Sequence, residues 1–374
     1  MSDLKYADAL CRTENPLDWT ESQRRTFVAA TRELALYNFE ASPDIRGLYQ
    51  KHGFDPSSIE SEDDIARIPP LSVTAMKHML FLSKDEDQAV LKLTSSGTSG
   101  QKTQIWFDQE SLDRVQATLD RLWQQEGLRS EKRTNYLMFV HNPEKAQDLG
   151  IAFSCKNAQR HAPPHETVYA IDREPGEDWR FQRERCWETL KRFAAQKLPV
   201  RIIGIPSFMY DLVKNARKTD RLSLPPGSLL MTGGGWKAAE NEKISLERFR
   251  ALMSEFLGLP LESIRDGYGM AEHSAPYTQC KHHRLHVPAF ARVLVRHPVT
   301  LEVLPPGEVG LLELVCPFNT MMPNLALLTT DMGMLDPTPC PCGANAPTFS
   351  LVGRAGLSKH KGCAITAGEI LKRE

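Results

Sequence analysis

The sequence has no long apolar run and no excess of charge of either sign. Its 46 lysines and arginines are balanced by 47 acidic residues, which gives a formal net charge of -1 at pH 7. This balance argues against nucleic acid or an anionic membrane surface as the main partner. The two longest stretches without a charged residue, 314–330 and 337–353, are interrupted by prolines, so neither predicts a membrane span.

A signal peptide and internal repeats are also missing. The N-terminus has no apolar run of the kind that export requires, so we expect a cytoplasmic protein. The eight cysteines are unevenly spread, and five of them lie at or beyond residue 280. In a reducing compartment, clustered cysteines are more typical of metal ligands or nucleophiles than of disulfides.

Short apolar runs alternate with helical patterns over much of the chain. The runs that predict strands cover residues 89–94, 104–107, 135–141, 200–205 and 228–233. Helices are expected over 18–40, from about 112 to 127, after Pro206, and over 240–257. Thr20 and Gln23 have the spacing of a capping box, and residues 68–77 predict a loop that enters a further helix. This alternation predicts an α/β core with a mostly parallel sheet.

The pattern changes after about residue 285. Alternating apolar residues and Pro-Gly turns there predict antiparallel hairpins. We therefore expect three parts: an α/β core with N-terminal helices over 1–284, a smaller β-rich subdomain over 285–353, and a C-terminal tail over 354–374.

A polar, glycine-rich segment follows the first predicted strand. It comprises Ser95, Ser96, Gly97, Thr98, Ser99, Gly100, Gln101 and Lys102. Glycines let backbone N–H groups approach an anion, and hydroxyls with a lysine add donors to phosphate oxygens. Gly97 and Lys102 are too close for a Walker motif. On its own the segment fits either a phosphate-binding loop or a polar surface turn.

The segment resembles the phosphate-binding loop of the acyl-adenylate-forming superfamily, and further motifs of that superfamily follow in the expected order. The matching residues are Gly233, Gly234, Gly235, Tyr268, Gly269, Glu272, Asp331 and Arg354. The resemblance implies a glycine turn and a tyrosine beside adenine, a magnesium ligand at Glu272, and a ribose-binding aspartate at Asp331 followed by Arg354. It also implies the large-domain fold of these enzymes, with ATP and Mg²⁺ as cofactors.

The end of the chain is similar to that of the acyl-protein synthetases, the LuxE-type component of bacterial fatty acid reductase. The similarity rests on residues 353–366, which include Cys363, and on the segment 286–318. Members of this family adenylate a fatty acid, move the acyl group to their own cysteine and deliver it to a reductase. The resemblance implies that Cys363 is the acyl acceptor, that an acyl-CoA-reductase-like protein is the partner, and that the superfamily's usual C-terminal lysine domain is absent.

Two clusters of soft ligands form a separate candidate site. Cys280 and His286 lie in the first cluster, and Cys340 and Cys342 lie in the second. Together these residues would make a closed Cys₃His zinc site, which is structural by type. His282 or His283 would serve in place of His286, and unligated buried cysteines are the alternative.

These observations predict an ATP-dependent, AMP-forming acyl-protein synthetase that acts on a carboxylic acid, with a fatty acid as the first candidate. Its expected catalytic residues are Cys363, Glu272 and Lys102. Two alternatives stay open. One is a ligase for an aromatic acid, such as a phenazine carboxylate, that passes the acyl group directly to CoA, a carrier thiol or a reductase. The other is a non-catalytic protein that binds nucleotide or carboxylate.

Overall fold

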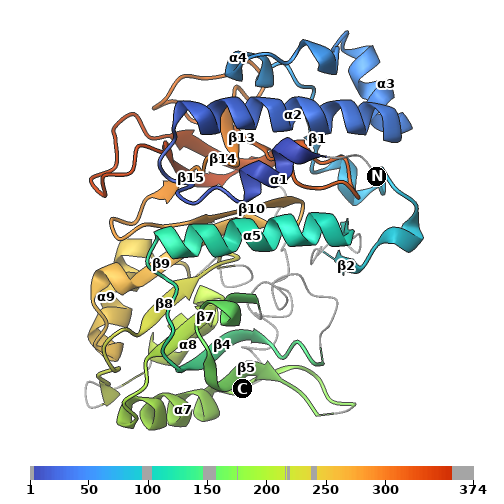
Figure 1. Ribbon diagram of the computed structural model, residues 1–374. Helices are drawn as coiled ribbons and strands as arrows, with labels where there is room; N and C mark the ends of the chain where they lie inside the picture. Colours follow the sequence, from blue (N-terminus) through green and yellow to red (C-terminus); the bar gives the residue numbers. More distant parts are fainter. Residues whose placement is uncertain are drawn as a thin grey trace.

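The computed structural model describes residues 4–94, 103–145, 157–174, 176–214, 216, 220–236 and 242–355. Its strands form two main sheets and a small hairpin, with helices packed around them (Figure 1). Along this part of the chain, no helix combines the length and the apolar character that crossing a membrane requires.

The first sheet contains seven strands within the described residues, in the order β10-β9-β8-β7-β4-β5-β6. Their bounds are β4 Thr134–His141, β5 Pro164–Asp172, β6 Arg180–Phe181, β7 Val200–Gly204, β8 Leu229–Thr232, β9 Ile264–Met270 and β10 His273–Thr278. Pairing is parallel from β9 through to β5 and antiparallel at the two edges. Every residue of β4 is buried, as expected for a strand covered on both faces.

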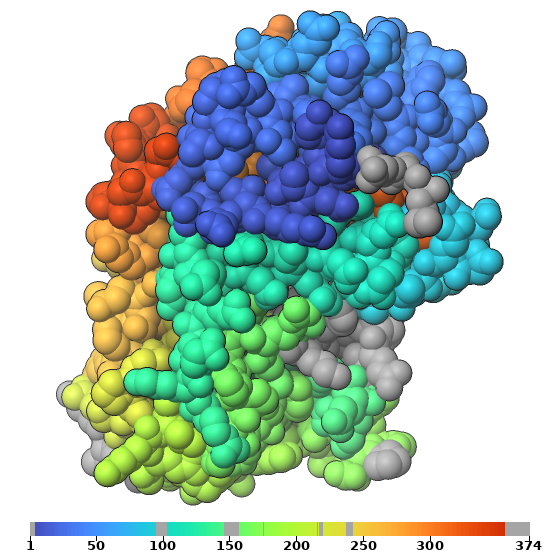
Figure 2. Space-filling model, viewed as in Figure 1, coloured from blue at the N-terminus to red at the C-terminus, as the bar shows by residue number. Residues whose placement is uncertain are grey.

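Helices connect the strands of this sheet. They are α5 Gln109–Gln125, α7 Arg183–Ala195, α8 Pro206–Lys214 and α9 Leu246–Leu257. The last three link successive strands in sequence, which gives the crossover connections that parallel strands need. Figure 2 shows α5, in teal, crossing the surface between the N-terminal helices and the first sheet. Thr320 donates a hydrogen bond of 2.7 Å to Asp108, the N-cap of α5, and so ties this helix to the C-terminal part of the chain.

The second sheet is antiparallel and is built mainly from the C-terminal strands. Its order is β11-β15-β14-β13-β12, with β1 parallel to β14. The bounds are β1 Leu71–Ser72, β11 Leu285–His286, β12 Arg292–Arg296, β13 Gly310–Val315, β14 Ala326–Leu335 and β15 Thr348–Arg354. The hairpins expected beyond residue 285 are therefore confirmed.

The N-terminal helices lie against this second sheet. They are α1 Lys5–Cys11, α2 Glu21–Ala41, α3 Pro43–Lys51 and α4 Glu62–Ile65. The guanidinium of Arg292, on β12, lies 3.9 Å from the ring centroids of Trp19 and Phe27 and pairs with Glu62. Burial of this cation is thus offset by a carboxylate and by two aromatic faces.

A two-stranded hairpin, β2 Leu91–Thr94 with β3 Gln104–Phe107, has a small core of its own. Leu93 and Ile105 pack there with Met321 and Met322. The backbone N–H of Trp106 also points at Met322 Sδ, 3.1 Å away. The hairpin is thereby fixed to the segment that leads into β14.

Several local predictions are confirmed and one is wrong. Both hydrogen bonds of the capping box at Thr20 and Gln23 are present, and α2 begins directly after Thr20. The expected helix beyond 68–77 does not form. Residues 71–72 instead pair with residues 327–328 of β14, and only the 3-10 turns Ala75–Lys77 and Glu86–Gln88 follow before β2. The pairing partner of residues 71–72 is distant in the sequence, so the local pattern did not reveal this strand.

Candidate active site

Three residues assigned to nucleotide binding meet between the two sheets. The hydroxyl of Tyr268, on β9, donates a hydrogen bond of 2.9 Å to Asp331 Oδ2. Arg354 Nε, on β15, donates one of 2.8 Å to Asp331 Oδ1. Both oxygens of one carboxylate are therefore held, one from each sheet. We call Tyr268, Asp331 and Arg354 the Tyr268 cluster.

Strand register and aromatic packing explain this meeting. Asp331 and Arg354 are directly paired on the antiparallel strands β14 and β15. The backbone N–H of Asp331 donates to the Thr329 hydroxyl at 3.0 Å. On the other side, the ring of Tyr268 meets Phe349 of β15 edge to face, with 5.8 Å between centroids. The positions of the hydroxyl and the carboxylate are thus set by contacts on both sheets.

The electrostatics of the cluster keep Tyr268 a hydrogen-bond donor. Burial raises the pKa of Tyr268 well above its usual range, and the Asp331 carboxylate raises it further. The Glu272 carboxylate acts in the same direction, so it lies within electrostatic reach of Tyr268. Arg354 leaves 72% of its side chain exposed. The cluster therefore presents a cation and a buried carboxylate to any ligand that approaches from this side.

Glu272 lies in the turn between β9 and β10 and is buried. The side-chain amide of Asn324 donates a hydrogen bond of 2.7 Å to the backbone oxygen of Glu272, which ties this turn to the segment before β14. Magnesium sites typically use one or two carboxylates together with substrate phosphates. Glu272 fits such a role because it offers a carboxylate directly beyond the carboxyl end of a parallel strand.

The glycine turn lies at the same edge of the first sheet. The backbone N–H of Gly233 donates a hydrogen bond of 3.1 Å to Gly204 at the end of β7. Gly234 and Gly235 have φ values of 77° and 68°, a region that glycine occupies without steric cost. Ligands of α/β sheets bind outside the carboxyl ends of the strands. Gly233 follows β8 and Glu272 follows β9, so the structure brings these two motifs to one edge.

Two other sets of candidate residues lie outside the described residues. They are Cys363 in the tail and the loop residues Ser95, Ser96, Gly97, Thr98, Ser99, Gly100 and Lys102. The strands that flank the loop are described, and Thr94 is paired with Gln104 across the hairpin. The core of this hairpin contacts Met270 and Ala271, directly before Glu272. The hairpin is therefore anchored beside the turn that carries the proposed magnesium ligand.

The four predicted metal ligands also come together. The ligand atoms of Cys280, His286, Cys340 and Cys342 all lie within 4.8 Å of one another. Cys280 Sγ is 3.6 Å from Cys340 Sγ, and Cys342 Sγ is 3.3 Å from His286 Nε2. His282 and His283 are not part of this set, because His286 alone of the three lies on β11. We call these four residues the cysteine cluster.

The surroundings of the cysteine cluster act in opposite directions on two of its thiols. Burial raises the pKa of Cys340 to about 12. Burial alone would raise the pKa of Cys280, but hydrogen bonds from His286 and from nearby backbone N–H groups lower it overall. The N–H groups of His282 and Ala344 point at Cys280 Sγ and Cys342 Sγ, at 3.4 and 3.5 Å. Cys280, Cys340 and Cys342 form no disulfide, so their sulfurs are available to bind a metal.

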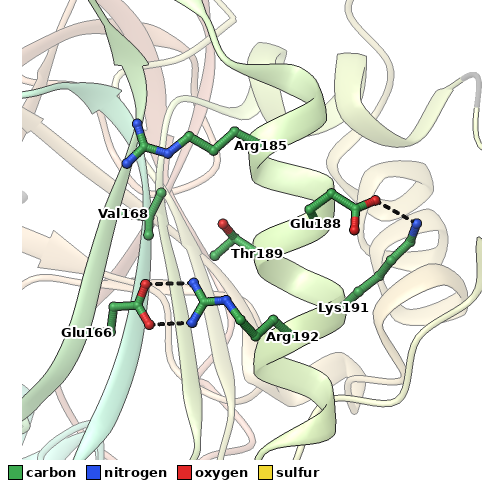
Figure 3. Close-up of a pocket in the computed structure, with 7 residues that line it drawn as sticks. All are labelled: Glu166, Val168, Arg185, Glu188, Thr189, Lys191 and Arg192. Carbon is green, nitrogen blue, oxygen red and sulfur yellow. Dashed lines mark hydrogen bonds and ion pairs between the residues drawn. The ribbon is translucent and has the colours of Figure 1, made fainter.

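A surface cavity of about 610 Å³ lies elsewhere, between β5 and α7 (Figure 3). Its charged side chains face one another: Arg192 pairs with Glu166, and Lys191 pairs with Glu188 at 2.9 Å. In the strand order of the first sheet, β5 is four places from β9. The cavity is therefore separate from the Tyr268 cluster, and its charges are already satisfied.

Sequence reasoning missed the residues that position the site. Asn324, Thr329 and Phe349 support Glu272, Asp331 and Tyr268 respectively. Each is a common residue in an unremarkable local pattern. Asn324 and Phe349 reach the site through long-range packing that no local signal reveals, whereas Thr329 lies only two residues before Asp331 on β14.

Comparison with known proteins places the chain in a family. It matches the acyl-protein synthetase (LuxE) family over residues 3–372. A long-chain-fatty-acid–luciferin-component ligase from Aliivibrio fischeri is 22% identical over 374 residues, covering 98% of this chain and 94% of that protein. A protein of the same name from Vibrio harveyi is 24% identical over 369 residues, covering 97% and 93%.

Solved structures of adenylate-forming ligases share the fold. An open conformation of 2-hydroxyisobutyryl-CoA ligase, in complex with 2-HIB-AMP and CoA, has a TM-score of 0.69 at 18% identity and covers 88% of this chain and 74% of that one. The same ligase in its postadenylation state has a TM-score of 0.71 at 18% identity and covers 90% and 69%. The adenylate-forming fold expected from the sequence is thus confirmed. The match over nearly the whole chain shows that this protein belongs to the acyl-protein synthetase (LuxE) family.

Proposed function

We propose that this protein uses ATP to activate a fatty acid as an acyl-adenylate and then carries the acyl group on Cys363 as a thioester. Membership of the acyl-protein synthetase family makes the chain an ATP-dependent acyl ligase. The observation that carries the site assignment is the Tyr268 cluster, in which a tyrosine, an aspartate and an arginine from two sheets converge. The fatty acid is proposed from the names of the two relatives.

In the first half-reaction, a carboxylate oxygen of the acid attacks the α-phosphorus of ATP and the bond to pyrophosphate breaks. Asp331 accepts hydrogen bonds from the ribose hydroxyls, which places the α-phosphate in line with the incoming carboxylate. Glu272 is the proposed ligand of Mg²⁺, which neutralises phosphate charge when bound. Lys102 and the hydroxyls and N–H groups of residues 95–100 are the proposed donors to the phosphate oxygens.

In the second half-reaction, the thiolate of Cys363 attacks the acyl carbonyl carbon, and the carbon–oxygen bond to AMP breaks. The products are a thioester on the protein and free AMP. Lys359, His360 and Lys361 precede the cysteine in the sequence, and neighbouring cations favour the thiolate form that attacks. A partner protein that resembles an acyl-CoA reductase is the proposed acceptor of the acyl group, as the relatives' name for a luciferin component suggests.

Three further assignments belong to this proposal. The protein acts in the cytoplasm, where its thiols stay reduced. Residues 1–284 form the adenylating core, 285–353 the β-rich subdomain and 354–374 the acyl-carrying tail. A structural zinc ion at the cysteine cluster completes the cofactor set, together with ATP and Mg²⁺.

The test of the first half-reaction is acid-dependent exchange of labelled pyrophosphate into ATP. Exchange should require Mg²⁺ and should be supported by long-chain fatty acids in preference to aromatic carboxylates. Asp331→Ala should reduce it strongly, whereas Arg192→Ala, in the remote surface cavity, should leave it unchanged. Exchange that depends on aromatic acids alone, or no exchange with any acid, would contradict the proposal.

A further inference from the structure

The cysteine cluster lies where the chain passes from the first sheet to the second. Strand β10, at the edge of the first sheet, ends at Thr278, and Cys280 lies two residues further along the chain. The chain then enters β11, where His286 pairs with Thr348 of the second sheet. Cys340 and Cys342 lie in the connection between β14 and β15. The four ligands thus join the link between the sheets to a loop within the second sheet.

We propose that a zinc ion bound by Cys280, His286, Cys340 and Cys342 clips the two sheets together and thereby holds the Tyr268 cluster in position. The zinc site is built from residues that take no part in the proposed reaction. The expected effect of zinc on nucleotide binding rests on the proposed function, whereas the zinc-mediated link between the two sheets does not depend on it.

The geometry of the four residues fits tetrahedral zinc. With zinc–sulfur bonds of about 2.3 Å, two sulfurs in a tetrahedral site are about 3.8 Å apart. The distance between Cys280 Sγ and Cys340 Sγ is 3.6 Å. His286 Nδ1 lies 3.3 Å from the carbonyl oxygen of Ala346, which orients the ring and leaves Nε2 for the metal. Three sulfurs and one imidazole fill all four positions, so the site is of the closed, structural type.

An aromatic layer connects the clip to the Tyr268 cluster. Phe349, on β15, is paired with Leu285, directly beside the ligand His286. Its ring meets Tyr277 and Tyr268 edge to face, with 5.1 and 5.8 Å between centroids. Tyr277 and Tyr268 are themselves cross-strand partners on β10 and β9. A shift of β11 against β15 would therefore displace Phe349. Phe349 would in turn displace Tyr268, which donates the hydrogen bond to Asp331.

The Tyr268 cluster is sensitive to such a shift because its hydrogen bond crosses between the sheets. Tyr268 lies on the first sheet, and its acceptor Asp331 lies on the second. A hydrogen bond of 2.9 Å weakens steeply once donor and acceptor move apart. Other links between the sheets, such as Asn324 to Glu272, would remain without zinc. We therefore expect the loss of zinc to weaken nucleotide binding at the Tyr268 cluster without abolishing it.

The first experiment measures the metal directly. Purified wild-type protein should contain about one zinc ion per chain. Replacement of zinc by Co²⁺ should give the visible absorption of a tetrahedral cobalt–thiolate site, a readout that needs no variant. Cys340→Ser should lose the metal, whereas the matched control His282→Ala, in the same loop but outside the ligand set, should keep it. Wild-type protein without zinc, and without a cobalt signal, would overturn the site.

The second experiment measures the clip on nucleotide-free protein by hydrogen exchange. Stripping zinc from the wild type with a chelator should speed amide exchange in both β9–β10 and β14–β15, and adding zinc back should restore protection. Exchange that stays unchanged in these strands when the metal leaves would overturn the clip. His282→Ala should behave as the wild type throughout.

A titration with a fluorescent ATP analogue then measures the effect on the site. Coupling through packed networks is typically 0.5–2 kcal/mol, so metal loss should weaken binding about two- to thirty-fold. Equal affinity with and without zinc would overturn the link to the Tyr268 cluster. A protein that shows metal-dependent exchange but binds no ATP would refute the proposed function while supporting the clip.

Discussion

The hydrogen bond between Tyr268 and Asp331 can be removed with little other change. Tyr268→Phe deletes the hydroxyl and keeps the ring that packs against Phe349. Hydrogen bonds to charged groups contribute about 1.5–3 kcal/mol. Asp331 keeps its bond from Arg354, and its side chain is 11% exposed, so water can replace part of the loss. We expect the free energy of unfolding to fall by about 1–2 kcal/mol.

The same change should weaken nucleotide binding. Without the Tyr268 hydroxyl, one oxygen of Asp331 loses the donor that fixes its direction, and the carboxylate must be ordered again when ribose binds. An ordering cost of about 0.7–1.4 kcal/mol corresponds to a three- to tenfold weaker affinity for ATP. Asp331→Asn should weaken binding more, because it removes a negative acceptor for the ribose hydroxyls and for Arg354.

A double-mutant cycle measures both effects. Tyr268→Phe, Asp331→Asn and the double variant would be compared by chemical denaturation and by titration with a fluorescent ATP analogue. The coupling energy in stability should be at least about 1 kcal/mol, because the two groups are in direct contact. Tyr136→Phe is the matched control, since it removes a buried hydrogen bond to Ala162 far from the site and should leave ATP affinity unchanged. Zero coupling, or equal ATP affinities for Tyr268→Phe and Tyr136→Phe, would refute the reasoning.

Three other predictions concern single residues. Glu272→Gln should lower acid-dependent pyrophosphate exchange about 100-fold, because a buried carboxylate is lost from the proposed magnesium site; exchange assays across Mg²⁺ concentrations check this. Burial raises the pKa of Asp266 to about 6, so between about pH 4 and 6 the folded protein holds a proton that the unfolded chain has released. As the pH rises through this range, the free energy of unfolding of the wild type should fall by up to about 3 kcal/mol relative to that of Asp266→Asn, as measured by urea titration at each pH. Arg296→Met should lower the free energy of unfolding by about 3 kcal/mol, since it leaves the buried Glu313 carboxylate without its cation.

Features with local causes were predictable from the sequence. The capping box at Thr20 and Gln23 depends on residues three positions apart, and both of its bonds form. Gly258 ends α9 in the left-handed conformation, as a glycine after an apolar helix predicts. Strands β4, β7 and β8 were predictable because parallel strands that are covered on both faces form continuous apolar runs in the sequence.

Features with distant causes were not predictable in this way. Strands β9 and β10 contain glycines and polar residues, and they are held in the sheet by pairing with β8 and with each other. The choice of His286 over His282 and His283 follows from the pairing of β11 with β15, which the spacing of histidines does not reveal. The motif residues of the Tyr268 cluster were each identified from the sequence, but the bonds that join them depend on strand register across 63 residues.

The acyl group on Cys363 is the central claim, and the mass of the intact protein tests it most directly. Wild-type protein and Cys363→Ser would be incubated with Mg²⁺-ATP and a panel of aliphatic and aromatic acids. The mass of each intact protein would then be measured by mass spectrometry before and after treatment with neutral hydroxylamine. The account predicts a fatty-acyl adduct on the wild type alone, which hydroxylamine removes as expected for a thioester. An adduct of equal size on Cys363→Ser, or release of AMP with no adduct on the wild type, would contradict it.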